Sequence, residues 1–151
     1  MNLSKNLTLD EATKSATALR KGIDNTPTPA IIETMKLTAE KVFQPLRDKV
    51  GPIIVSSFYR CPALNKAIGG STSSQHMKGE AIDMSGVNVS NAELFEEALK
   101  LEQFDQLIWE FGTDKNPAWI HISYSKTHNR KQVLVATKSK GSTVYKPYVK
   151  R

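Results

Sequence analysis

Two histidines and one aspartate have the side-chain types and the spacing of a zinc site. His76 and Asp83 lie seven positions apart with Gly79 between them, and His121 lies in the apolar run Trp119-Ile120-His121-Ile122-Ser123. Catalytic zinc takes three protein ligands of the histidine and carboxylate type and leaves one position for water or substrate. We therefore predict a Zn²⁺ site made by His76, Asp83 and His121. A single histidine in an apolar strand is also commonly a core residue, so the prediction depends on the three residues together.

The local sequence indicates which elements position these ligands. Residues 71–78 are polar and irregular, which predicts a loop around His76, and residues 80–84 suit a brief strand carrying Asp83. The apolar runs at 104–111 and 119–124 are joined by a loop rich in turn formers, so they are expected to be adjacent antiparallel strands. Asp83 then lies on a strand, and a neighbouring strand can carry a second ligand beside it.

The remaining pattern predicts an α+β domain that spans residues 1–151. Helical spacing and capping residues predict helices, with a kink or early end at Pro45 in the second of them. The expected helices cover residues 9–21, 30–50, 61–68 and 91–101, further strands cover 52–58 and 132–137, and the tail from residue 138 is polar and basic. Helices followed by strands favour a small, mostly antiparallel sheet with flanking helices.

Composition excludes several classes of protein. The chain has 151 residues, of which 39% are hydrophobic and 24% charged, as in soluble globular proteins. Cys61 is the only cysteine, which excludes an internal disulfide and a cysteine-cluster zinc site, and we interpret it as a packed residue at a helix start rather than a nucleophile. No apolar run is long enough to span a bilayer, and the polar first residues do not resemble a secretory signal.

Positive charge is concentrated in the last quarter of the chain. The net charge is +6, and residues 115–151 hold nine Lys or Arg and no Asp or Glu. Such a surface attracts nucleic acid, anionic lipid or acidic envelope polymers, or it serves only as a solvated face. A nucleic-acid binder leaves the His-Asp-His set without a role, so no specific nucleic acid partner is predicted.

Four segments in the same order resemble the zinc D-Ala-D-Ala carboxypeptidase family, especially its small phage and prophage branch. They are residues 56–65, the turn at 68–70, the pattern S-x-H-x-x-G-x-A-x-D at 74–83, and W-I-H-I-S at 119–123. The family also includes vancomycin-resistance dipeptidases, phage endolysins that cut L-Ala-D-Glu bonds, and the hedgehog signalling domain. The resemblance implies the hedgehog and DD-peptidase type of fold, and zinc-dependent hydrolysis of peptide bonds in the stem peptides of peptidoglycan by a metal-activated water.

The resemblance also implies roles for individual residues. His76, Asp83 and His121 correspond to the metal ligands. Arg60 is expected to point into the site, where a guanidinium binds a substrate carboxylate or a developing oxyanion, and Ser74 is expected beside the metal as a hydrogen-bonding group. Without the resemblance, these two residues would be interpreted as a surface arginine at a strand end and a loop serine.

One position departs from the family pattern. Relatives commonly carry an acidic general base three positions before the last histidine, where this chain has Ala118. The nearest acids are Glu110, which ends the preceding apolar strand, and Asp114 in the following loop. The segment Trp109-Glu110-Phe111-Gly112 resembles one typical of the small phage branch, so Glu110 is predicted as the general base. A carboxylate at this position also suits a surface ion pair.

The absent acid leaves a second function open. A zinc-containing binding module or a structural phage component of the same fold would keep the metal site without catalysis. If the chain is an enzyme, carboxypeptidase and endopeptidase action both remain compatible with the sequence. We expect a monomer that is cytoplasmic when made and acts on the cell wall after release or as part of a phage particle.

Overall fold

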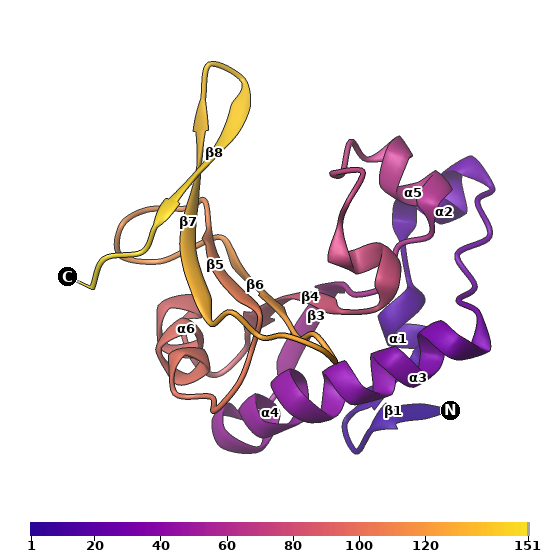
Figure 1. The fold of residues 1–151 in the computed structure, drawn as a ribbon, viewed down its shortest axis with the longest axis horizontal. Coiled ribbons are helices and arrows are strands. Elements are labelled where there is room, and N and C mark those ends of the chain that lie inside the picture. Colours follow the sequence, from indigo (N-terminus) through magenta and orange to yellow (C-terminus); the bar gives the residue numbers. More distant parts are fainter. Residues whose placement is uncertain (151) are drawn as a thin grey trace.

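The computed structural model describes residues 1–150 and shows a mixed sheet of six strands with helices packed against it (Figure 1). The strands follow the order β3-β4-β6-β5-β7-β8, and every neighbouring pair is antiparallel except β5 and β7. Their bounds are β3 (Ile53–Ser57), β4 (Ala81–Gly86), β5 (Gln106–Glu110), β6 (Trp119–Ser123), β7 (Gln132–Ser139) and β8 (Ser142–Pro147). The prediction of an α+β fold with a small, mostly antiparallel sheet is confirmed.

The N-terminal half is helical and opens with a small hairpin of β1 (Asn2–Ser4) and β2 (Leu7–Thr8). The helices are α1 (Leu9–Thr13), α2 (Ala16–Lys21), α3 (Pro29–Thr38), α4 (Gln44–Val50), α5 (Pro62–Ala67) and α6 (Asn91–Leu99), with a π-helical turn at Ala39–Phe43 and a 3-10 turn at Gln75–Lys78. Within residues 1–150, no helix has both the length and the apolar character needed to cross a membrane.

Two of the predicted helices are interrupted. The prediction of one helix over 9–21 is wrong, because Lys14 adopts an extended backbone and the Ser15 hydroxyl then caps α2 by accepting a hydrogen bond from the Ala18 N–H. The predicted effect of Pro45 is confirmed. Proline lacks an N–H and its ring clashes with the carbonyl four residues earlier, and the chain passes through the π-helical turn directly before it.

Strand alternation divides the sheet into a core face and a site face. Ile120 and Ile122 are fully buried, and Trp109, which pairs with Ile120, packs edge-on against Phe95 of α6. The helix α6 therefore covers this face. Because successive strand residues point to opposite faces, His121 and its partner Asp83 project from the other side of the sheet.

Gly79 fixes the turn that connects the two ligands His76 and Asp83. Its φ is +72°, and its carbonyl accepts a hydrogen bond from Thr38 Oγ1 at 2.9 Å. A Cβ at this position would lie 2.6 Å from Met35 Cγ in the core. A side chain here therefore meets both backbone strain and a steric clash.

Gly79→Ala is expected to lower the free energy of unfolding by about 2–4 kcal/mol, as backbone strain and overpacking add. Gly69→Ala is the matched control, because Gly69 has a φ of +75° but no atom within 4 Å of the added methyl. Gly69→Ala should therefore lower the free energy of unfolding only by the cost of backbone strain, about 1–2 kcal/mol. Urea unfolding followed by circular dichroism measures both losses, and equal losses would contradict the role given to the Met35 contact.

Candidate metal centre

The three predicted ligands come together on the site face of the sheet. Asp83 of β4 lies directly opposite His121 of β6, and His76 approaches from the 3-10 turn that precedes β4. His121 Nδ1 is 3.0 Å from Asp83 Oδ1, and His76 Nε2 is 3.4 Å from Asp83 Oδ2. One ligand atom of each residue lies within 4.8 Å of those of the other two. The donor atoms therefore converge on one point.

The protein fixes the orientation of His76. Its side chain is almost fully buried, with 2% of the residue exposed. Nδ1 lies 2.8 Å from the backbone carbonyl of Phe58, which can only accept, so Nδ1 carries the hydrogen and Nε2 presents its lone pair to the cluster. Burial lowers the pKa of the imidazole, which favours the neutral form that binds a metal. His76 is therefore preorganised as a ligand.

Asp83 supplies the negative charge of the cluster. Burial by itself would raise the pKa of this carboxyl, but the neighbouring imidazoles of His76 and His121 outweigh that effect and hold the pKa well below its usual range. An ionised carboxylate with two imidazoles is a common donor set for catalytic zinc. The residues present therefore fit Zn²⁺.

Glu110 lies on the same face as the cluster, at the end of β5. It is two residues beyond Ile108, the register partner of His121, so strand alternation points both side chains to one side. Only 7% of Glu110 is exposed, and no group of residues 1–150 hydrogen-bonds to its carboxylate. Burial raises the pKa of Glu110 to about 7, with the charge of Asp83 adding to the rise and His121 opposing it. This is the pKa range in which a carboxylate exchanges protons at neutral pH.

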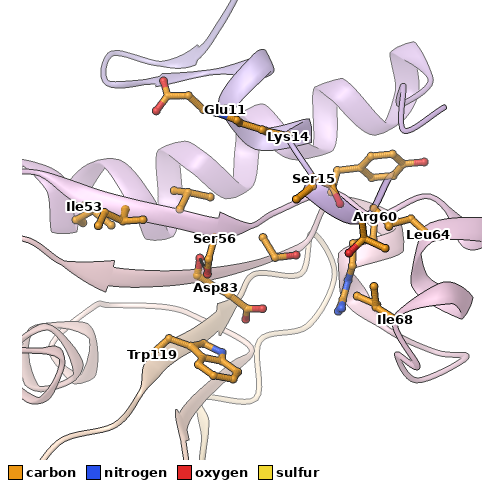
Figure 2. A pocket seen from close by; sticks show the side chains of 16 residues that line it. Glu11, Lys14, Ser15, Ile53, Ser56, Arg60, Leu64, Ile68, Asp83 and Trp119 are labelled. Atoms are coloured by element: carbon orange, nitrogen blue, oxygen red, sulfur yellow. Dashed lines mark hydrogen bonds between the residues drawn. The ribbon is translucent and has the colours of Figure 1, made fainter. Parts of the chain in front are cut away.

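A pocket of about 830 Å³ begins at Asp83 and Trp119 and extends along β3 to the break between α1 and α2. Figure 2 shows the guanidinium of Arg60 and the carboxylate of Asp83 on the walls of this pocket. Arg60 Nη2 donates to Ser74 Oγ at 3.3 Å, while its buried Nε has no partner within residues 1–150. Burial lowers the pKa of this arginine and Asp83 opposes the change. An anionic group in the pocket would thus find a partly desolvated cation.

A family model described as Peptidase M15 matches residues 5–123, which include all three cluster residues as well as Arg60 and Glu110. The chain belongs to the Peptidase M15 family. M15 peptidases depend on zinc, so the protein is a zinc metallopeptidase, and the His76-Asp83-His121 cluster is a group that can hold its metal. A search of curated proteins gives no match.

Glu110 lies next to Ala118, the position three residues before His121. The backbone N–H of Ala118 donates to the carbonyl of Glu110 at 2.9 Å, so the two residues are neighbours across the β5–β6 turn. The acid at the end of β5 thus lies next to Ala118, the position at which the family resemblance predicted an acid. Asp114 is exposed in the connecting loop, and His128 is exposed in the loop after β6.

Other predicted and unpredicted residues support the site. Cys61 caps α5 through its Sγ, in agreement with a structural role. Asn25 was not predicted, yet its amide oxygen accepts from Cys61 N–H at 2.7 Å and its nitrogen donates to Tyr59 O at 3.0 Å, which anchors both neighbours of Arg60.

An ion pair between the buried Asp105 and the exposed Arg130 was also not predicted. The carboxylate of Asp105 accepts from Arg130 Nε at 2.9 Å and from Gln75 Nε2 at 3.1 Å, so it ties the residue next to His76 to the loop before β7. The hydrogen bonds from Arg130 lower the pKa of Asp105. No local pattern signals this pair, because its members lie on separate loops.

Proposed function

We propose that this M15 peptidase hydrolyses peptide bonds in the stem peptides of bacterial peptidoglycan, with His76, Asp83 and His121 holding the zinc. The observation that carries the proposal is the buried, unpartnered carboxylate of Glu110 on the same face as the cluster. When bound, zinc polarises a scissile carbonyl and lowers the pKa of water. The further work of the reaction falls to the side chains around it.

Glu110 acts as the general base in this proposal. It accepts a proton from the attacking water and passes it to the leaving amine, a task for which a pKa of about 7 is suited. A non-catalytic binding module has no use for a buried carboxylate with no partner, because burying an uncompensated acid costs stability. The catalytic function is therefore preferred to the binding module.

Arg60 provides the affinity for substrate carboxylates. Stem peptides carry carboxyl groups along their length, and the partly desolvated guanidinium lines the same pocket as the ligand residue Asp83. Ser74 Oγ accepts from Arg60 Nη2 and also from the His76 backbone N–H at 3.2 Å, so one hydroxyl links the carboxylate-binding group to a ligand residue. The basic surface of residues 115–151 would hold the monomeric enzyme near an anionic wall.

Digestion of purified peptidoglycan by the zinc-loaded protein, with mass spectrometry of the released fragments, tests this function. Loss of a terminal D-Ala would identify a carboxypeptidase, and new internal termini would identify an endopeptidase. Both products should disappear in the presence of a chelator and in Glu110→Gln. Intact peptidoglycan after digestion by protein that holds one zinc per chain would reject the proposal and favour the binding module.

A further inference from the structure

The C-terminal hairpin of β7 and β8 follows the residues matched by the family model and completes one edge of the sheet. Ala136 of β7 pairs with Glu110 on one side and with Tyr145 of β8 on the other. Directly paired residues share a face, so Tyr145 lies in the same row as Glu110 and on the same face as Asp83 and His121. Ala136 therefore lies between Glu110 and Tyr145 in this row.

Tyr145 lies on the site face of the sheet, in the edge strand β8. The residue is 53% exposed, and its hydroxyl makes no hydrogen bond with any group of residues 1–150. Burial raises the pKa of the phenol, and the negative charges of Glu110 and Asp83 raise it further. At neutral pH the phenol therefore keeps its proton and remains a hydrogen-bond donor.

Tyr148, three residues further along, shows the opposite arrangement. Its ring stacks on Trp109 on the core face, and its hydroxyl donates to Glu96 of α6 at 3.4 Å. Tyr148 thus packs against the core face, whereas Tyr145 lies on the face that carries the metal cluster. In Figure 1 the hairpin and the α5 segment that follows Arg60 rise on the same side of the sheet, at its two ends. In the sheet order, β4 and β6, which carry Asp83 and His121, lie between β3, which precedes Arg60, and β8, which carries Tyr145.

We propose that Tyr145 is a further catalytic residue, whose hydroxyl donates a hydrogen bond to the carbonyl oxygen of the scissile bond as negative charge develops there. The inference rests on the proposed function. A neutral donor held by a strand acts on the transition state more than on the bound substrate, because the charge that it stabilises exists only there. The phenol is well suited to this role because no group of residues 1–150 accepts a hydrogen bond from its hydroxyl.

Tyr145→Phe tests the inference, and Tyr148→Phe is the matched control, since it removes the same hydroxyl group from the other face of the same hairpin. For Tyr145→Phe we expect kcat on a stem peptide to fall by about 10-fold or more, with KM changed by less than about 2-fold. Tyr148→Phe should keep both constants. Zinc content and unfolding temperature should match the parent protein in both variants.

Affinity for a phosphinate dipeptide provides a readout that does not depend on turnover. The phosphinate carries the negative charge of the tetrahedral state, so calorimetry should show about 10-fold weaker binding to Tyr145→Phe and unchanged binding to Tyr148→Phe. Unchanged kcat and unchanged phosphinate affinity in Tyr145→Phe would overturn this inference and leave the proposed function standing. A rise in KM without a fall in kcat would do the same. A parent protein that releases nothing from stem peptides would overturn the proposed function and, with it, this inference.

Discussion

His76→Ala is expected to release the zinc and to reduce peptide hydrolysis by about 1,000-fold or more. Loss of a group that merely orients a ligand typically costs 10–100-fold in metal affinity or activity, and loss of a ligand removes a direct bond as well. The ring of His76 is fixed at both nitrogens, because Nδ1 is hydrogen-bonded to the Phe58 carbonyl and Nε2 faces Asp83. Zinc content after dialysis and the rate on a stem peptide measure the two losses.

The experiment must separate metal loss from unfolding, because His76 is buried and its backbone carbonyl accepts a hydrogen bond from the Arg60 N–H. Asp83→Asn is a second variant that keeps the shape of the side chain while removing its charge, and it should also lose zinc. His128→Ala is the matched control, since His128 is exposed in a loop away from the cluster. Retention of one tightly bound zinc by folded His76→Ala would show that the metal lies elsewhere.

The ligand set could be predicted from the sequence because local signals and the family resemblance indicate the same three residues. His76 and Asp83 flank a glycine within one short segment, and the β-branched residues around His121 indicate a strand. The pairing of β4 with β6 and its register, which bring Asp83 opposite His121, are long-range features of the fold. Glu110 was predicted from the resemblance of residues 109–112 to the small phage branch, and its burial and raised pKa emerge only from the packing around it.

The rest of the site depends on contacts that sequence does not encode locally. The tail after residue 138 has few apolar residues, because β8 is an edge strand with most of its side chains in solvent, and so it lacks the signal of a strand. The importance of Tyr145 follows from its pairing with Ala136 and from the parallel pairing of β7 with β5, both of which are long-range. The contact of Asp105 with Arg130 has the same origin.

Glu110→Gln is expected to lose about 100- to 10,000-fold in kcat while retaining zinc. Glutamine keeps the volume of the side chain but cannot accept the proton of the attacking water. Asp114→Asn is the matched control, because it neutralises the next acid along the chain, in the exposed loop. Zinc content and kcat measured side by side test the assignment. Full activity of Glu110→Gln, or an equal loss in Asp114→Asn, would contradict it.

The pH dependence follows from the same carboxylate. A general base works only when ionised, so kcat/KM should rise with pH up to an apparent pKa at or below about 7, because bound zinc favours the ionised form. This rise should be absent from the residual activity of Glu110→Gln. A profile that falls between pH 5 and 7 would be incompatible with Glu110 as the base.

Stability should change in the opposite direction to activity. The folded-state pKa of Glu110 is raised above its ordinary value of 4.5, so the folded protein binds this proton more tightly than the unfolded chain does. The stability associated with the protonated group is therefore present below pH 4.5 and is lost as the pH rises through about 7. Glutamine does not ionise, so metal-free Glu110→Gln does not lose this stability as the pH rises. It should be more stable than the metal-free parent protein at pH 8 by at most about 3 kcal/mol, with little difference at pH 4. Thermal unfolding at the two pH values measures the difference.

A buried acid that lowers stability at neutral pH has a physical reason to be there only if its proton affinity is used in the reaction. Higher stability of Glu110→Gln together with lost turnover would therefore argue for catalysis over binding.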